Sequence, residues 1–258
     1  RSPVCRGRKN RKEVQIMKKI FCLLLALVMA LSLVACGGTA DDGGKTPAAA
    51  KLRFVTGGES GTYYGFGSVL ANHATNNAGV SVVALSSDGS KANVISLEEK
   101  EAELGFCQSD VMAYAYNGTN IFADAGKVDC FSVLGALYTE QVQIVTTNPD
   151  IKSVADLEGK SVSVGAPASG VYFNAVDILS AYGIGDRDAD GKFTKINATY
   201  QSFGDSADAL KNGQIDAAFI VAGAPTTAVT DLATTKSVSL VSLDDEHIEK
   251  LLASSPYY

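Results

Sequence analysis

Histidine and arginine are scarce in this chain, and each scarcity excludes a class of site. The 258 residues include two histidines, His73 and His247. His73 falls late in an amphipathic helical pattern and His247 in a charged one, where a packed or solvated ring is the default. A Ser-His hydrolase is therefore disfavoured. From position 36 onward the only arginines are Arg53 and Arg187, so the sequence does not indicate a site built around an arginine clamp.

The motifs of nucleotide and hydrolase sites are also missing. The glycine-rich stretch FVTGGESGTYYGFGSVL (54–70) lies between a β-branched run and an amphipathic one. It has no Lys-Ser/Thr pair after its glycines, so it is not a P-loop, and no G-x-G-x-x-G fits between a strand and a helix. The G-x-S-x-G elbow fails too, because Thr62 stands two residues after Ser60 where that motif needs glycine. We therefore expect no catalytic residue and no enzymatic activity.

The N-terminal residues have the pattern of an export signal. From Met17 the chain reads MKKIFCLLLALVMALSLVAC, a basic start and an apolar run that ends at Cys36. It resembles a lipoprotein signal peptide over 17–35, which implies cleavage before Cys36 and acylation of that cysteine. An uncleaved membrane helix is the alternative, but the run is shorter than the roughly 20 residues that a span needs. Residues 36–50 indicate a flexible tether.

This signal predicts an extracytoplasmic protein, lipid-anchored to the outer face of the bacterial cell membrane or in the periplasm. Residues 1–16 precede a complete signal and include Lys12-Glu13-Val14, which AAGGAGGT, a ribosome-binding sequence, can encode. We interpret 1–16 as translated leader that is not native.

The charge balance argues against a nucleic-acid partner. Residues 1–35 hold eight of the 22 basic residues and one of the 28 acids, which leaves 14 basic and 27 acidic residues and a net charge of −13. Phosphate binding needs clustered cations, which such a chain does not supply. Two cysteines follow Cys36, and the sequence leaves open whether Cys107 and Cys130 form a disulfide or remain thiols.

Short β-branched runs alternate with helical patterns from Lys51 onward, which predicts an α/β fold with parallel sheet. We expect strands at 52–56, 80–86, 104–107, 131–138, 142–147, 161–165, 215–221 and 237–241, and helices at 62–74, 90–100, 108–116, 169–182, 205–212, 224–234 and 244–254. Two extended segments in succession mark a crossing between lobes. They predict lobe one at 51–142, lobe two at 143–242 and a return to lobe one at 243–258, where we expect the lobe to be truncated.

Glycine-rich turns recur where a predicted strand meets a helix. The stretch 54–70 has counterparts at 164–179 and 220–232, with weaker versions at 86–97 and 107–116. Each turn places backbone N–H groups at a helix N-terminus, where the partial positive charge favours anions. The alternative is ordinary helix capping, because good capping residues stand at Ser60, Thr62, Ser90, Ser109 and Ser169. Several such turns without a catalytic constellation indicate a binding cleft.

Four strings in register carry a family resemblance: TGGESGTYYGFG, SSDGSKANVISLEEKEAELGFCQSD, IKSVADLEGKSVSVGAPASG and ALKNGQIDAAFIVAGAP. From about Lys51 to its end the chain resembles the TAXI-type solute receptors of tripartite ATP-independent periplasmic (TRAP) transporters. The resemblance implies a two-lobed, type II-like periplasmic-binding-protein fold with a hinge and an interlobe cleft. It implies capture of a small anionic solute, a carboxylate or an amino acid such as glutamate, for TRAP membrane subunits driven by an ion gradient. We expect a monomer without a cofactor.

The resemblance also implies which residues contact the solute. One cleft wall would consist of Gly58, Ser60, Gly61, Thr62 and Tyr63, with Ser90, Gln108, Ser109 and Asp110 nearby and Ala166, Ser169, Gly170, Gly223 and Ala224 on the opposing wall. The chain departs from the family where Val171 and Tyr172 replace the usual threonine and glutamate, and where Gly65 and Phe66 replace proline and an aliphatic residue. The first departure removes polar groups from a wall, so the usual ligand does not follow.

One acidic segment resembles a calcium loop. DRDADGKFTKIN places Asp186, Asp188 and Asp190 at the spacing of EF-hand ligands, but Asn197 stands where the bidentate glutamate belongs. A structural calcium site and a solvated acidic turn both fit this pattern.

Other functions remain as alternatives. A binding protein for an ATP-driven importer or a sensor kinase would share the same fold. A surface lipoprotein or an extracytoplasmic enzyme on that fold belongs to a different class.

Overall fold

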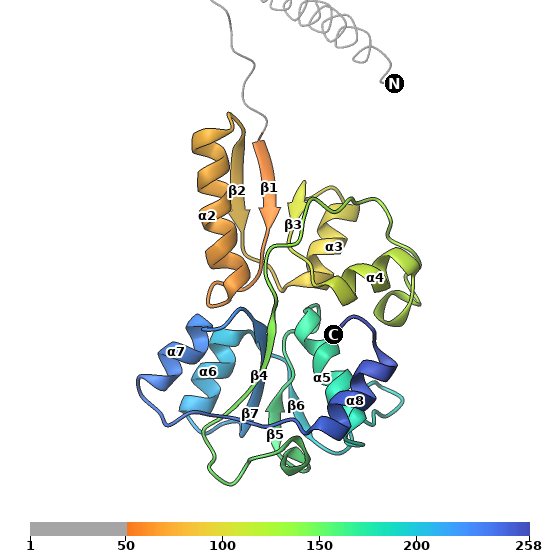
Figure 1. The fold of residues 1–258 in the computed structure, drawn as a ribbon, viewed down its shortest axis with the longest axis vertical. Helices are drawn as coiled ribbons and strands as arrows, with labels where there is room; N and C mark the ends of the chain where they lie inside the picture. Colours follow the sequence, from red (N-terminus) through yellow and green to blue (C-terminus); the bar gives the residue numbers. More distant parts are fainter. Residues whose placement is uncertain (1–50) are drawn as a thin grey trace, which may run out of the picture. The chain divides into compact units, whose positions relative to one another are not determined.

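Two β-sheets organise residues 51–258, the part of the chain that the computed structural model describes (Figure 1). The leader, signal peptide, lipidated Cys36 and tether that the sequence predicts lie at residues 1–50, outside the described residues. In chain order the elements are β1 (Lys51–Val55), α2 (Thr62–Asn77), β2 (Ser81–Leu85), α3 (Ser90–Glu98), β3 (Leu104–Gly105), α4 (Ser109–Asn117), η1 (Asn120–Phe122), β4 (Gln141–Thr146), η2 (Val154–Leu157), β5 (Ser161–Ser163), α5 (Gly170–Ala181), β6 (Asn197–Thr199), α6 (Phe203–Lys211), β7 (Ala217–Ala222), α7 (Thr227–Ala233), β8 (Ser239–Leu240) and α8 (Asp245–Ser254).

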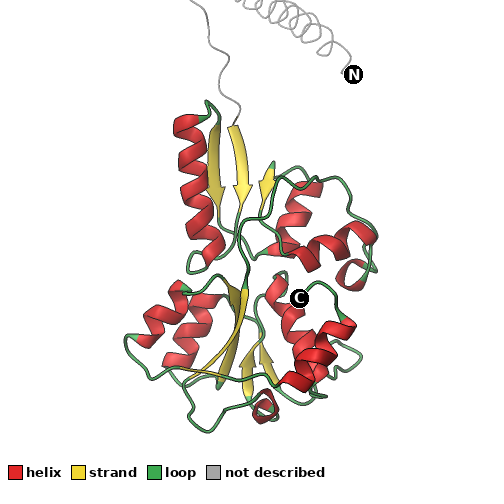
Figure 2. Ribbon diagram, in the orientation of Figure 1, coloured by secondary structure: helices red, strands yellow, loops and turns green. Residues whose placement is uncertain are grey.

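The first sheet has the strand order β2-β1-β3, and both neighbours of β1 run parallel to it. Helix α2 covers one side of this sheet, and α3 and α4 lie on the other (Figure 2). Buried Phe54, Ala71 and Phe106 pack together between α2 and the sheet. Gly67 permits this close packing, because a Cβ there would stand 2.5 Å from Thr56 Cγ2.

The second sheet has the order β6-β5-β7-β4-β8, in which β5 runs parallel to β6 and β7 while β4 runs antiparallel to β7 and β8. Every residue of β7 is buried, which is expected of a strand with helices on both faces. Helices α6 and α7 lie on one side of this sheet, and α5 and α8 lie on the other (Figures 1 and 2). We call the parts around the two sheets lobe one and lobe two.

The alternation predicted from the sequence is confirmed, since each expected helix is present within a few residues of its predicted bounds. The prediction of a strand at 131–138 is wrong. This segment forms no regular structure, and Val133, Leu134 and Leu137 are exposed at 62%, 87% and 53%. Its β-branched and aromatic residues favour a strand, but a strand forms only where a neighbour pairs with it, and no strand among the described residues pairs with this segment. The short β6 was not expected.

The C-terminal segment differs from expectation, because α8 packs against lobe two rather than lobe one. Leu251 belongs to the core that contains β5, β7 and α5, and the ring of His247 stacks on Tyr182 with centroids 3.7 Å apart. Only the last residues reach lobe one, where the ring of Tyr257 meets the ring of Tyr114 edge-on at 5.7 Å. Helix α8 packs against α5, which lets the apolar face of this amphipathic helix join the core of lobe two.

Candidate functional site

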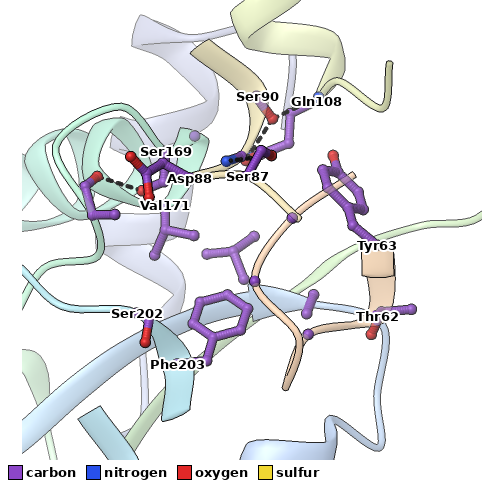
Figure 3. Close-up of a pocket in the computed structure, with 18 of the residues that line it drawn as sticks. Thr62, Tyr63, Ser87, Asp88, Ser90, Gln108, Ser169, Val171, Ser202 and Phe203 are labelled. Atoms are coloured by element: carbon purple, nitrogen blue, oxygen red, sulfur yellow. Dashed lines mark hydrogen bonds between the residues drawn. The ribbon is translucent and has the colours of Figure 1, made fainter. Parts of the chain in front are cut away.

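The pocket lies where the carboxyl ends of the parallel strands of the two lobes face each other. It has a volume of about 80 Å³. This is well below the roughly 300 to 1,000 Å³ of sites for drug-sized ligands, so it suits a small metabolite. Its lining consists of Gly57, Gly58, Gly61, Thr62, Tyr63, Ser87, Asp88, Gly89, Ser90, Gln108, Glu140, Ala166, Ser169, Gly170, Val171, Gln201, Ser202, Phe203, Val221 and Ala222. Figure 3 shows Thr62 and Tyr63 on one wall, Ser169 and Val171 on the opposite wall, and Phe203 between them.

Four helices begin at this pocket. The residues at the starts of α2, α3, α5 and α6 all contribute to the lining. The first N–H groups of a helix have no partner within it and carry part of the positive end of the helix dipole. Two helices from each lobe therefore present positive partial charge to one small volume.

The capping alternative accounts for only some of these helix starts. Ser169 caps α5 by accepting from the backbone N–H of Tyr172 at 3.2 Å, and Ser202 caps α6 in the same way. The residues that precede α2 and α3 are Gly61 and Gly89, and neither helix has a side-chain cap. Of the five residues expected as caps, Ser60, Thr62, Ser90 and Ser109 do not cap their helices, because each helix begins beside a residue without a capping oxygen in reach.

A polar network crosses between the lobes at one end of the pocket. Gln108 Nε2 donates to Asn174 Oδ1 at 2.7 Å, and Asn174 Nδ2 donates to Asp110 Oδ2 at 3.1 Å. The Gln108 backbone N–H donates to Ser90 Oγ at 3.1 Å. Burial raises the pKa of Asp110, and the hydrogen bonds from Val111 and Asn174 oppose this effect. This network fixes the Gln108 side chain against the start of α5.

Further hydrogen bonds join the lobes around the rim. Thr62 Oγ1 donates to the carbonyl of Gly223 at 3.1 Å, and the N–H of Ala228 donates to the carbonyl of Ser60 at 3.2 Å. On the other side, the N–H of Ala92 donates to the carbonyl of Ala168 at 3.1 Å. The two walls are therefore in contact, and the pocket is bridged rather than a wide-open groove.

Glu140 brings a carboxylate to the pocket from the segment that crosses between the lobes. The Tyr63 hydroxyl donates to its Oε2 at 3.5 Å. Burial and the nearby charge of Asp110 raise the pKa of Glu140 to about 8, and the Tyr63 hydrogen bond opposes the rise. Burial also raises the pKa of Tyr63. The hydroxyl of neighbouring Tyr138 is buried and has no hydrogen-bond partner in residues 51–258.

The structure brings most of the sequence-predicted site residues together. The lining includes Gly58, Gly61, Thr62, Tyr63, Ser90, Gln108, Ala166, Ser169 and Gly170, and it excludes Ser60, Ser109, Asp110, Gly223 and Ala224. Among the excluded residues, Asp110 supports Gln108 through Asn174, and Gly223 accepts the bond from Thr62.

Sequence reasoning missed Glu140, Ser87, Asp88, Gln201 and Phe203, all of which line the pocket. Gln201 and Phe203 follow β6, which the sequence did not reveal. Glu140 lies outside every glycine-rich turn, and its Tyr-x-Glu setting gave no signal of a site.

The two departures from the family pattern have different consequences. Val171 lines the pocket and makes that wall apolar, whereas the Tyr172 hydroxyl accepts a hydrogen bond from Arg187 at 3.3 Å. Phe66 packs in lobe one, with its ring 6.3 Å from that of Phe106. Gly65 has open space around it.

The remaining reactive groups lie apart from the pocket lining. His73 contacts Asn77, and His247 pairs with Asp244 at 2.7 Å. Cys107 and Cys130 are free thiols, and burial raises the pKa of Cys107 to about 12. Neither histidine and neither cysteine of the described part is therefore among the residues that line the pocket.

The predicted calcium loop does not form a shared ligand set. The carboxylate of Asp188 accepts from the N–H groups of Asp190 and Lys192, while Asp186 pairs with Lys195 at 3.2 Å. Within residues 51–258, no three His, Cys, Asp or Glu side chains are grouped closely enough to hold a metal ion. The arrangement fits an acidic turn.

Solved structures with the same architecture include the glutamate-bound ligand-binding core of GluR0 from Nostoc punctiforme, which is 16% identical and covers 74% of this chain and 79% of that chain at a TM-score of 0.50. The MOPS-bound alkanesulfonate-binding protein SsuA from Xanthomonas axonopodis pv. citri is 17% identical and covers 76% of this chain and 62% of that chain at a TM-score of 0.48. This chain thus spans about three fifths of the length of SsuA.

These identities bear on the fold alone, which is the α/β type II periplasmic-binding-protein fold expected from the sequence. In the described residues, no helix combines the length and the apolar character that a bilayer span requires. A family model matches residues 54–258, which are almost the whole of the described part. The chain therefore belongs to the NMT1-like family.

Proposed function

We propose that this protein is an extracytoplasmic receptor that captures a small carboxylate-bearing solute, such as an amino acid, between its two lobes. The observation that carries the proposal is the meeting of four helix N-termini, those of α2, α3, α5 and α6, at one pocket of about 80 Å³. A carboxylate placed there would accept hydrogen bonds from backbone N–H groups of both lobes.

The expected energies are sufficient for a receptor. A helix terminus contributes about 0.3 to 1 kcal/mol to anion binding, and up to about 2 kcal/mol where it is partly buried. Charge-assisted hydrogen bonds contribute about 1.5 to 3 kcal/mol each. Micromolar binding requires about 8 kcal/mol, which three or four such bonds in a closed pocket would reach.

The receptor is proposed to serve a TRAP transporter, in which an ion gradient rather than ATP drives uptake. The four sequence strings that resemble TAXI-type receptors support this assignment, and each of them supplies residues to the pocket lining, including Gly61, Ser90, Ser169 and Val221. Acylated Cys36 is proposed to hold the receptor at the membrane surface as a monomer, beside the membrane subunits that receive the solute.

Native mass spectrometry of the purified protein tests the binding role first. We expect a small acid to be released when the protein is denatured, or mass to be gained with a panel of amino acids and carboxylates. A protein that is empty and remains empty with the whole panel would overturn the proposal. Turnover of the bound solute would instead indicate an enzyme.

The transporter and the anchor need separate measurements. Uptake of the identified solute by cells should stop when an uncoupler collapses the ion gradient and should survive depletion of ATP; the reverse result would favour an ATP-driven importer. The Cys36→Ala variant should leave the membrane fraction without a change in solute affinity, and unchanged membrane attachment would contradict the anchor.

A further inference from the structure

The pocket contains acidic side chains but no basic ones. Its lining includes two carboxylates, Asp88 and Glu140, and within the described residues no lysine, arginine or histidine contributes to it. A plain dicarboxylate would bring two negative charges to a pocket that holds Asp88 and, once it ionises, Glu140, and like charges at close range repel. The helix N-termini explain how one carboxylate could bind, but they leave the role of Glu140 open.

Glu140 has most of its hydrogen-bonding capacity unused. A carboxylate offers about four acceptor positions. Within residues 51–258 its only hydrogen bond comes from the Tyr63 hydroxyl at 3.5 Å, which is long and weak for a bond between two oxygens. Among the other titratable groups around it, Asp110 from α4 raises the pKa of Glu140. Glu140 in turn raises the pKa values of Tyr138 and Cys107. None of these groups supplies a positive charge.

A positive group of the solute would complete this arrangement. An ammonium carries three donors on a compact charge, and it would satisfy the free positions of Glu140 while offsetting the acidic neighbours. We propose that Glu140 recognises a protonated amine of the solute while the solute carboxylate lies at the helix N-termini. This inference rests on the proposed function. The solute is then an amino acid or a similar zwitterion rather than a plain carboxylic or dicarboxylic acid.

The rival role for Glu140 makes the opposite prediction. A protonated Glu140 could donate a hydrogen bond to a second carboxylate of the solute. In that case binding would weaken as pH rises and Glu140 ionises. Recognition of an ammonium requires ionised Glu140, so binding at pH 7 should release close to one proton and strengthen as pH rises toward 8.

Isothermal titration calorimetry on the full chain with matched pairs tests the inference. The probes are the L-amino acids, each compared with the acid that lacks the amine, for example L-glutamate against glutarate and L-alanine against propionate. Wild-type protein should prefer one or more of the amines by roughly 30-fold or more, the loss expected when one partner of a desolvated charge pair is removed. Titration in buffers of different ionisation enthalpy measures the released proton.

Two variants complete the design. Glu140→Gln keeps the shape of the side chain and should remove both the preference for the amine and the proton release, while affinity for the amine-free acid changes by less than about threefold. Glu98→Gln changes an exposed glutamate at the end of α3 and should behave as wild type. Because the wild-type preference and proton release need no variant, the inference stays testable even if Glu140→Gln fails to fold.

The outcomes separate the inference from the function on which it rests. Amine-free acids that bind as tightly as their amines, or a preference that survives Glu140→Gln, would overturn the inference and leave the receptor standing. Proton uptake instead of release would also overturn it. If no amino acid or acid of the panel binds at all, both the receptor for such solutes and the role of Glu140 are wrong.

Discussion

At the scale of single residues, the pocket combines half-buried polar groups that each have few partners, two of them in the opposite lobe. Gln108 depends on Asn174, Thr62 depends on the carbonyl of Gly223, and Glu140 has only Tyr63. Such groups cost stability when they are desolvated without a full set of partners. Single substitutions at these positions should therefore separate binding from stability.

Glu140 should make the empty protein less stable at high pH. Its folded pKa is raised to about 8 from 4.5, so between these values the unfolded chain has lost a proton that the folded chain keeps. The free energy of unfolding therefore falls as pH rises through this range. Glu140→Gln should unfold at the same urea concentration as wild type at pH 5. At pH 8 its free energy of unfolding should be about 2 kcal/mol higher than that of wild type, which is less than the full pKa shift would give because Glu140 is only partly buried.

Urea titrations of both proteins at pH 5, 6.5 and 8 measure this effect, with Glu98→Gln as the control for losing a surface charge. A stability difference that does not vary with pH would show that Glu140 does not titrate in this window.

Gly170→Ala should weaken binding without unfolding the protein. A Cβ on Gly170 would overlap the side-chain amide of Gln108, which would have to move and break its 2.7 Å bond to Asn174. A hydrogen bond of this kind contributes about 1 kcal/mol, so solute affinity should fall about fivefold. Calorimetry with the solute found by native mass spectrometry checks this, and wild-type affinity would mean that Gln108 does not hold the wall in place.

Sequence reasoning was most successful at residues whose role follows from the local backbone. The turn pattern indicated a cleft at the strand-to-helix turns, and the family resemblance implied Gly61, Ser169 and Gly170 there, all of which line the pocket. Glu140 and Phe203 are in the pocket because of how the lobes meet, which no local pattern records. The serines predicted as caps show the same limit. A serine caps a helix only if it stands directly before the first helical residue, and the sequence pattern does not fix that residue to within one or two positions.

At the scale of elements, α2 connects the glycine-rich turn to the packing of lobe one. Its glycines have opposite surroundings: Gly65 faces open space, whereas a Cβ on Gly67 would stand 2.5 Å from Thr56 Cγ2 and 3.0 Å from the ring of Phe106. Gly65→Ala should therefore stabilise the protein by about 0.5 to 1 kcal/mol, the difference in helix propensity.

The matched variant two positions along should have the opposite effect. Gly67→Ala gains the same propensity but forces the helix away from β1, and overpacking a core costs about 1 to 3 kcal/mol. Its net effect should be destabilising. Chemical denaturation of the two variants beside wild type measures both, and equal effects would contradict the close contact between α2 and the sheet.

Elements with strong local patterns were predictable, and elements defined by pairing were not. The helices follow from periodicity within one segment. The segment 131–138 has the composition of a strand, yet it pairs with no strand among the described residues, and its Leu134 is exposed. In β6 the sequence Asn-Ala-Thr carries little strand preference, and its pairing with β5 decides its structure.

At the scale of the whole molecule, the lobes meet through a few hydrogen bonds around a small pocket, so a bound solute should act as an additional bridge. Any ligand that binds only the folded state stabilises it by about 2.7 kcal/mol at one hundred times its Kd. We expect the melting temperature to rise with solute concentration for wild type and to respond less in Gly170→Ala. A melting temperature that stays constant at saturating solute would contradict binding between the lobes.

The acidic lining also has a consequence for the kinetics of association. Asp88 at the pocket is exposed, and the chain from Cys36 onward has a net charge of −13, so a dianion approaching the pocket meets repulsion before it enters. Salt shortens the range of this repulsion to about 10 Å at 0.1 M. In stopped-flow measurements, a dianion such as glutarate should associate faster as ionic strength rises, whereas the rate for a neutral zwitterion such as alanine should hardly change. The molecule would thus select its solute by the speed of capture, before any contact forms inside the pocket.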